Sequence, residues 1–181
     1  MRTMAQISQF RVIHSRWTLL IRDDDPVDVC GGHGTHVAGI IAADARNISA
    51  PQPFVGVAPG AILYMYRIFG CEGDAADDVV IDAMSRAFVD GMDVISMSIG
   101  EPIGWSEGPQ TVVANRIAAR GVPTSVAAGN GGHDGLFLSE EPASGTDICA
   151  VASVNNLAIF APVALTAQNR SIVLRRRKCK C

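Results

Sequence analysis

Several features that would mark a specialised class of protein are absent from this sequence of 181 residues. There is no internal repeat and no low-complexity linker. The longest late apolar stretch, residues 156–167, is too short to cross a bilayer. Residues 1–22 contain four arginines, which interrupt the apolar core that a signal peptide needs. The sequence therefore predicts no membrane span and no leader segment.

Aromatic and charged residues are also scarce, at 6% and 18% of the chain. Apolar residues make up 48%, and glycine and alanine are abundant, which favours close packing of helices on a sheet over disorder. This length suffices for one globular domain with a sizeable core. The five cysteines are an odd number and fix neither a disulfide framework nor a redox compartment.

The net charge of −3 conceals an uneven distribution. Residues 170–181 contain six basic side chains and no acidic one, so the remainder of the chain is strongly acidic. A basic tail can contact nucleic acid or an anionic membrane. A tail of twelve residues is more often simply solvated, so we expect no nucleic-acid partner.

The middle of the chain alternates between strand and helix patterns. Apolar residues at three- and four-residue spacing predict helices, and short apolar runs predict strands. The expected helices cover residues 33–45, 75–90 and 106–120, and the expected strands cover residues 62–68, 93–99, 122–127 and 148–153. Asp74 and Ser106 are the expected N-caps of the second and third helices, and Gly91 and Gly121 are their expected stops.

This alternation predicts an α/β fold in which helices cover both faces of a mainly parallel sheet. Functional loops of such sheets lie beyond the carboxyl ends of the strands, here residues 100–105 and 128–135. Residues 1–22 show no clear period, so we expect an irregular N-terminal segment. The alternation stops near residue 156, so we expect an ordered domain over residues 23–156 and a basic tail over residues 157–181.

The strongest chemical signal is a pair of histidines at the start of the first expected helix, in the run GHGTHVAG over residues 32–39. A histidine at a helix start, with bare backbone around it, suits a general base that a bulky substrate must reach. The positive end of the helix disfavours the imidazolium form, which leaves His33 able to accept a proton. One histidine alone would be explained more simply by a packed helix with a buried imidazole.

The whole run resembles the histidine motif of the subtilisin-like serine proteases, the subtilases. The resemblance implies that His33 is the base of a catalytic triad and that His36 is a packed structural histidine. Residues 127–132 (AAGNGG) read locally as a polar turn. Their position, with Asn130 lying 97 residues after His33, resembles the subtilase oxyanion motif. Asn130 would then donate its side-chain amide to the oxyanion of the tetrahedral intermediate.

A third motif, VISMSIG over residues 94–100, reads as a buried strand and resembles the substrate-binding segment of the subtilases. The resemblance implies that the backbone of Ser98, Ile99 and Gly100 pairs with an extended polypeptide, which supplies affinity through main-chain hydrogen bonds. Gly100 removes a side chain that would block this approach. Residues 56–59 (GVAP) resemble a turn of the family and are expected to be structural.

The resemblance covers residues 23–155, with the three motifs in the family's order. It implies a partial subtilisin-like three-layer fold and a serine endopeptidase that hydrolyses polypeptides as a monomer. It implies no cofactor, and structural calcium sites are not readable from the sequence. It also implies an extracellular location for an intact parent, while the location of this chain stays unknown.

Two parts of the family pattern are not found in the sequence. No apolar strand ending in an aspartate motif precedes His33, and the upstream acids lie in a polar loop: Asp23, Asp24, Asp25 and Asp28. The Gly-Thr-Ser motif that carries the nucleophile is also absent. A protease without its serine forms no acyl-enzyme, so we expect this chain to be an inactive fragment of an active subtilase.

Three alternatives stay open. A non-catalytic pseudoprotease would bind peptides through residues 98–100 without cleaving them. A nucleotide-binding site is disfavoured because the glycines before the helix do not continue into a G-x-G-x-x-G or P-loop pattern. A metal site formed by Cys30, His33 and His36 lacks the usual second pair of ligands.

Overall fold

The computed structural model of the chain describes residues 3–8, 30–47, 49, 53–72, 74–135, 138–154, 157 and 163–173. The helices in these residues are α1 (His33–Ala42), α2 (Asp77–Val89) and α3 (Pro109–Ala118). The strands are β1 (Thr3–Ser8), β2 (Ile62–Arg67), β3 (Val94–Met97), β4 (Thr124–Ala127), β5 (Cys149–Val151), β6 (Val163–Leu165) and β7 (Ser171–Val173).

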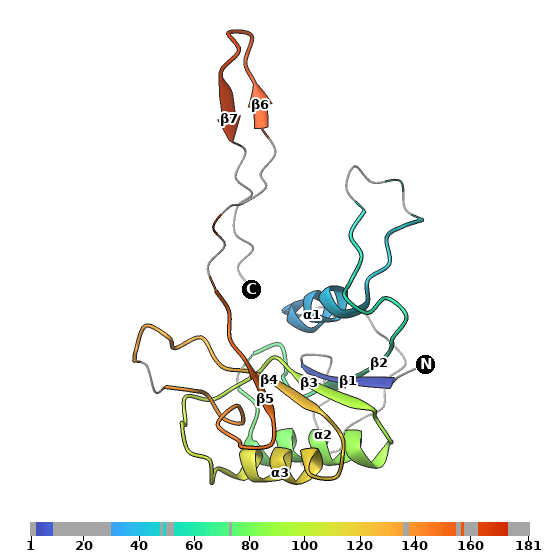
Figure 1. The fold of residues 1–181 in the computed structure, drawn as a ribbon, viewed down its shortest axis with the longest axis vertical. Coiled ribbons are helices and arrows are strands. Elements are labelled where there is room, and N and C mark those ends of the chain that lie inside the picture. Colours follow the sequence, from blue (N-terminus) through green and yellow to red (C-terminus); the bar gives the residue numbers. More distant parts are fainter. Residues whose placement is uncertain are drawn as a thin grey trace.

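Five strands form one parallel sheet in the order β2-β1-β3-β4-β5. Figure 1 shows α1 on one face of this sheet and α2 and α3 on the other. These three layers confirm the predicted α/β fold with a mainly parallel sheet. The fold is therefore built so that helices cover both faces of the sheet and loops leave it at its two ends.

The seven elements predicted from the sequence are all present, and each predicted end lies within three residues of the observed one. Gly91 and Gly121 follow α2 and α3 with φ angles of 76° and 90°. Glycine adopts this left-handed conformation without strain, so both helices end as predicted.

The predicted N-caps of these two helices are wrong. The residue before the first turn of α2 is Ala76 rather than Asp74, and in α3 it is Gly108 rather than Ser106. Neither Ala76 nor Gly108 has a side chain that could cap the backbone. For α3, the missing hydrogen-bond acceptor comes from a distant part of the chain.

Glu141 supplies the cap of α3. Its side chain is 1% exposed, and its Oε1 accepts a hydrogen bond from the backbone N–H of Thr111, in the first turn of α3, at 3.0 Å. The unpaired N–H groups and the dipole at this end of a helix stabilise a carboxylate. A methyl group on Gly108 would overlap the Glu141 carboxylate, so only glycine fits beside it. No local sequence pattern marks a cap that comes from another segment.

Strand β1 corrects the prediction of an irregular segment over residues 1–22. Residues 3–8 form a strand that pairs with β2 on one side and with β3 on the other. A strand inside a parallel sheet is stabilised by two hydrogen-bond ladders and does not need the apolar–polar alternation of a half-exposed strand. The prediction is therefore wrong for residues 3–8, because the sheet determines this strand more than its own pattern does.

The core lies between the sheet and the layer formed by α2 and α3. The apolar side chains with no exposed surface come from both helices and from β3: Ala83, Met84, Ala87, Ala114 and Ile95. Small alanines let the helices approach the sheet closely, as the abundance of alanine predicted.

The other layer, α1, is fixed at its carboxyl end by backbone hydrogen bonds. The N–H of Val57 donates to the carbonyl of Ile40 at 3.1 Å, and the N–H of Ala58 donates to that of Ile41 at 2.7 Å. These bonds satisfy carbonyls that a helix end leaves unpaired. Residues 56–59 thus have the structural role that the sequence predicted.

Beyond the sheet, β6 and β7 pair as an antiparallel hairpin that Figure 1 shows extending away from the other elements. Val163 and Leu165 in this hairpin are exposed. The alternation of strands and helices has therefore ended by β6, as predicted. The domain limit at residue 156 stays a prediction. Within the described ranges, no helix has the length and apolar character needed to cross a membrane.

Candidate active site

A hollow of about 330 Å³ lies at the carboxyl ends of the parallel strands. Its walls come from α1 and from the segments around and after β2, β3 and β4. The lining residues are His33, Phe69, Ser98, Ile99, Gly100, Ala127, Gly129, Asn130 and Glu140. All of the predicted site residues are among them. The sheet explains this meeting of distant motifs, since parallel strands present their following loops at one edge.

His33 is the first residue of α1 and is half-buried beside the hollow. Gly32 precedes it with a φ angle of 70°, and no side chain caps this helix end. His36 was expected to be packed but is exposed, so that expectation is wrong. The buried residue of α1 is Gly34, and His36 lies about 200° further around the helix.

A disulfide holds the start of α1 against the segment after β2. It joins Cys30, three residues before His33, to Cys71, two residues after the lining residue Phe69. Arg67 donates from Nη2 to Cys30 Sγ at 3.1 Å and from Nε to the carbonyl of Phe69 at 2.8 Å. Because Cys30 is bonded to Cys71, it is not the free thiolate that the metal-site alternative required.

Asn130 follows β4 and is exposed. Its backbone N–H donates to Glu140 Oε1 at 2.9 Å, which fixes the position of this loop residue. Gly129, just before it, has a φ angle of 113° and turns the chain out of the strand. In the described part of the chain, the side-chain amide of Asn130 makes no hydrogen bond and is available to a ligand.

Ser98, Ile99 and Gly100 continue from the end of β3 along the hollow. A short antiparallel bridge fixes their far end. The N–H of Glu101 donates to the carbonyl of Glu141 at 3.1 Å, and the N–H of Glu141 donates to that of Glu101 at 2.8 Å. The segment is therefore held at both ends, as a template for an added strand needs to be.

Comparison with known proteins decides the family. A model of the subtilase family matches residues 8–179, which is most of the chain. The chain belongs to the subtilase family. The matched span extends past the predicted domain limits at residues 23 and 156 in both directions, and those limits stay predictions.

The curated relatives of this subtilase include several subtilisins. Subtilisin E from Bacillus subtilis (strain 168) is 36% identical over 135 residues, which cover 74% of this chain and 34% of that protein. Subtilisin BL from Lederbergia lenta is 35% identical over 129 residues, which cover 71% of this chain and 46% of that protein. The subtilase chain thus spans between a third and a half of the length of these relatives.

Solved structures show the same fold. The patellamide maturation protease PatA superimposes with a TM-score of 0.63 at 21% identity, covering 86% of this chain and 57% of that chain. A psychrophilic subtilisin-like protease from the Antarctic psychrotroph Pseudoalteromonas sp. AS-11 superimposes with a TM-score of 0.59 at 24% identity. The match covers 82% of this chain and 35% of that chain. At these identities the likeness establishes the subtilisin-like fold alone.

Strand β1 does not end in an aspartate. β1 ends at Ser8, and residues 3–8 contain no acidic side chain. Outside the described residues lie the upstream acids Asp23, Asp24, Asp25 and Asp28. The described residues thus bring together the predicted base, the predicted oxyanion residue and the predicted substrate segment around one hollow.

Sequence reasoning missed two residues that shape the hollow, Glu140 and Phe69. Phe69 follows β2 and belongs to no motif. Glu140 stands in the run Glu140-Glu141-Pro142, and two adjacent acids before a proline were the only available signal. Neither residue could be assigned before the fold showed which loops meet.

Several carboxylates lie near Glu101, which follows the segment 98–100. Burial raises the pKa of Glu101, and the nearby carboxylates of Asp77, Glu141 and Asp74 raise it further. A raised carboxyl pKa means that a further negative charge is unfavourable at this place. The part of this effect that comes from the neighbouring carboxylates adds negative charge near the end of the segment 98–100.

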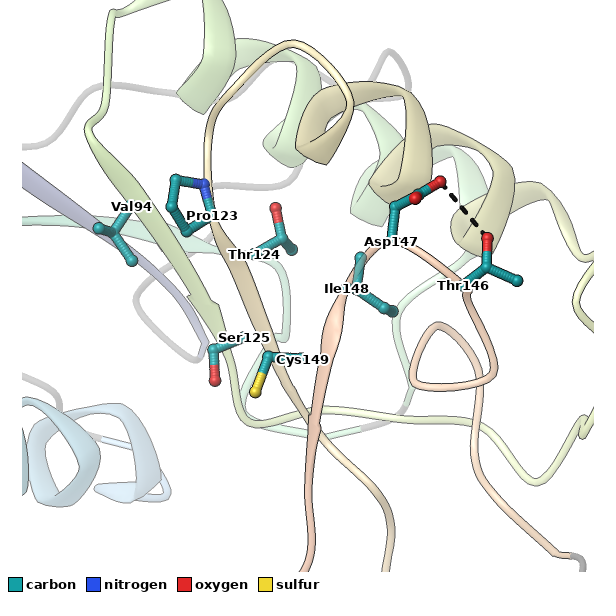
Figure 2. A pocket seen from close by; sticks show the side chains of 8 residues that line it. All are labelled: Val94, Pro123, Thr124, Ser125, Thr146, Asp147, Ile148 and Cys149. Carbon is teal, nitrogen blue, oxygen red and sulfur yellow. Dashed lines mark hydrogen bonds between the residues drawn. The ribbon is translucent and has the colours of Figure 1, made fainter.

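A second hollow of about 460 Å³ opens at the amino ends of β3, β4 and β5 (Figure 2). Its lining includes Ser125 and Cys149, which are paired across β4 and β5. No histidine is among its lining residues, so neither side chain has an imidazole base beside it. Figure 2 shows Asp147 directed toward Thr146, whose hydroxyl donates to Asp147 Oδ2 at 3.4 Å. We therefore assign no catalysis to this hollow.

Proposed function

We propose that this chain carries part of the catalytic centre of a serine endopeptidase that hydrolyses polypeptides bound in extended form. One observation carries the proposal. A single hollow collects the predicted base His33, the predicted oxyanion donor Asn130 and the predicted substrate segment 98–100. Membership of the subtilase family supports the same class of reaction.

The proposed mechanism gives each of these groups one task. The substrate lies as an added strand along residues 98–100 and presents a carbonyl group to Asn130. His33 accepts the proton of the attacking serine hydroxyl and later donates it to the leaving amine. The amide of Asn130 donates to the oxyanion, which forms only as the carbonyl is attacked.

We further propose that residues 1–181 bind peptides without hydrolysing them. The sequence contains neither the serine motif nor an aspartate at the end of β1. In a subtilisin, a member of this same family, loss of the serine alone lowers turnover by about 10⁶-fold. The second candidate function is a peptide-binding pseudoprotease. It is favoured by the presence of the segment 98–100 in the lining of the hollow, because binding of a strand there needs no nucleophile.

An extracellular setting is proposed for the intact protein, which would act as a monomer and without a cofactor. The disulfide between Cys30 and Cys71 supports this setting. Disulfides persist in oxidising compartments and are rare where cytosolic thiols are kept reduced.

Hydrolysis of a fluorogenic peptide by a parent protein that also carries the serine motif tests the base. We expect His33→Ala to reduce kcat to the uncatalysed background, because no other group accepts the serine proton. The matched control is His36→Ala, which removes an exposed histidine of the same helix and should leave kcat unchanged. Normal turnover by the His33→Ala protein would refute the assignment.

The same assay separates oxyanion stabilisation from substrate binding. Asn130→Ala should lower kcat by about 10²–10³-fold with little change in KM, a magnitude taken from a subtilisin and hence from this family. A change confined to KM would instead make Asn130 a substrate-binding residue.

A further inference from the structure

Glu140 is the residue of the hollow that the mechanism above does not use. Its side chain lies between two glycines, since a methyl group on Gly100 or on Gly129 would overlap it. Gly100 belongs to the proposed substrate segment, and Gly129 immediately precedes Asn130. The carboxylate is therefore placed between the substrate segment and the oxyanion residue.

One oxygen of this carboxylate has a structural task, and the other has none in the described residues. Oε1 accepts the backbone N–H of Asn130 at 2.9 Å. No hydrogen bond to Oε2 and no ion pair of Glu140 occurs within the described part of the chain. A half-buried carboxylate without a cation is unfavourable unless water or a ligand compensates its charge.

The rest of the hollow offers Glu140 no compensation. Apart from His33, the other lining side chains are neutral. Among the described residues, Glu140 and His33 form no ion pair within 4.0 Å. The hollow is therefore a small, negatively charged recess with one unused carboxylate oxygen.

We propose that Glu140 selects a basic side chain, lysine or arginine, at the substrate residue whose carbonyl group is presented to Asn130. This inference rests on the proposed function. A strand along residues 98–100 that directs its carbonyl to Asn130 places the side chain of that residue between the two, where Glu140 lies. An ammonium or guanidinium group there donates a charge-assisted hydrogen bond to Oε2 and neutralises the recess.

Binding of labelled tetrapeptides to the full 181-residue chain tests this selection. The probes are three alanines followed by arginine, norleucine or glutamate, each with an amino-terminal fluorophore, measured by fluorescence polarisation. We expect the arginine peptide to bind about ten-fold more tightly than the norleucine peptide, and the glutamate peptide to bind weakest. The arginine preference should also narrow as salt rises from about 0.05 to about 0.5 M.

Glu140→Gln is the decisive variant. The glutamine oxygen still accepts the N–H of Asn130, so the loop is retained while the charge is removed, and circular dichroism checks the fold. The arginine and norleucine peptides should then bind equally. Glu107→Gln, which removes an exposed carboxylate outside the hollow, should keep the wild-type preference.

The outcomes separate this inference from the proposed function. If all three peptides bind equally to the wild-type chain, or if the preference survives in Glu140→Gln, selection by Glu140 is refuted and peptide binding stands. If no peptide binds, the chain has no site for an extended substrate and both proposals are wrong. If His33→Ala instead keeps normal turnover, the assignment of the base is refuted. A salt-sensitive preference for the arginine peptide would still support selection by Glu140.

Discussion

The two faces of the sheet are held in different ways. On the face covered by α2 and α3, the helices bury side chains completely, Met84 and Ala87 among them (Figure 1). On the opposite face, the buried residue of α1 is a glycine, Gly34. That helix is held by the backbone bonds of the turn 56–59 and by the Cys30–Cys71 disulfide. One face thus carries the stability of the domain, and the other carries the proposed base.

Matched isoleucine-to-alanine substitutions on the two faces would break or sharpen this comparison. The largest effect is expected for Ile117→Ala in α3, where the side chain is 5% exposed. Loss of these buried carbons and the cavity left behind should lower the free energy of unfolding by about 2–5 kcal/mol. Urea denaturation followed by circular dichroism measures this loss. A negligible loss would mean that the α2–α3 layer is not the stabilising face.

An intermediate effect is expected from removal of the disulfide. Changing both Cys30 and Cys71 to serine should lower the free energy of unfolding by about 2–4 kcal/mol, because the two positions are 41 residues apart in sequence. Hydrogen exchange should accelerate first in α1 and leave α2 protected. The control, Cys149→Ser, changes an exposed free cysteine and should alter neither quantity. Equal acceleration in both helices would show that the disulfide supports the whole domain.

The smallest effect is expected for Ile40→Ala in α1, where the side chain is 47% exposed. The substitution keeps the carbonyl that accepts the N–H of Val57, so the free energy of unfolding should fall by less than about 1 kcal/mol. The same denaturation assay used for Ile117→Ala provides the measurement. A loss equal to that of Ile117→Ala would remove the proposed difference between the faces.

The parts of the fold that the sequence predicted depend on local patterns. The buried residues of α2, which include Val80, Ala83 and Met84, recur at three- and four-residue spacing, and that spacing is visible before folding. Strand β1 and the cap of α3 depend on partners elsewhere in the chain. For β1 the partners are β2 and β3, and for α3 the partner is the carboxylate of Glu141. Neither could be read from its own residues.

The same distinction applies to the candidate site. His33, Asn130 and the segment 98–100 stand in contiguous motifs, so the family resemblance indicated each of them. Glu140 is placed by the bridge at Glu141 and by two glycines from different loops. Its proximity to the motifs follows from tertiary structure alone, and no spacing in the sequence announces it.

The position of β1 has a consequence for how the domain assembles during synthesis. Thr3 pairs with Ile62 and Met4 pairs with Val94, so β1 joins two strands that are made much later. Loop closure over such distances is slow, and contacts of this kind delay folding. In the nascent chain, β1 therefore lacks its β3 neighbour until residues 94–97 are available. The sheet is therefore completed late in folding. The loops around the hollow reach their final alignment only at that stage.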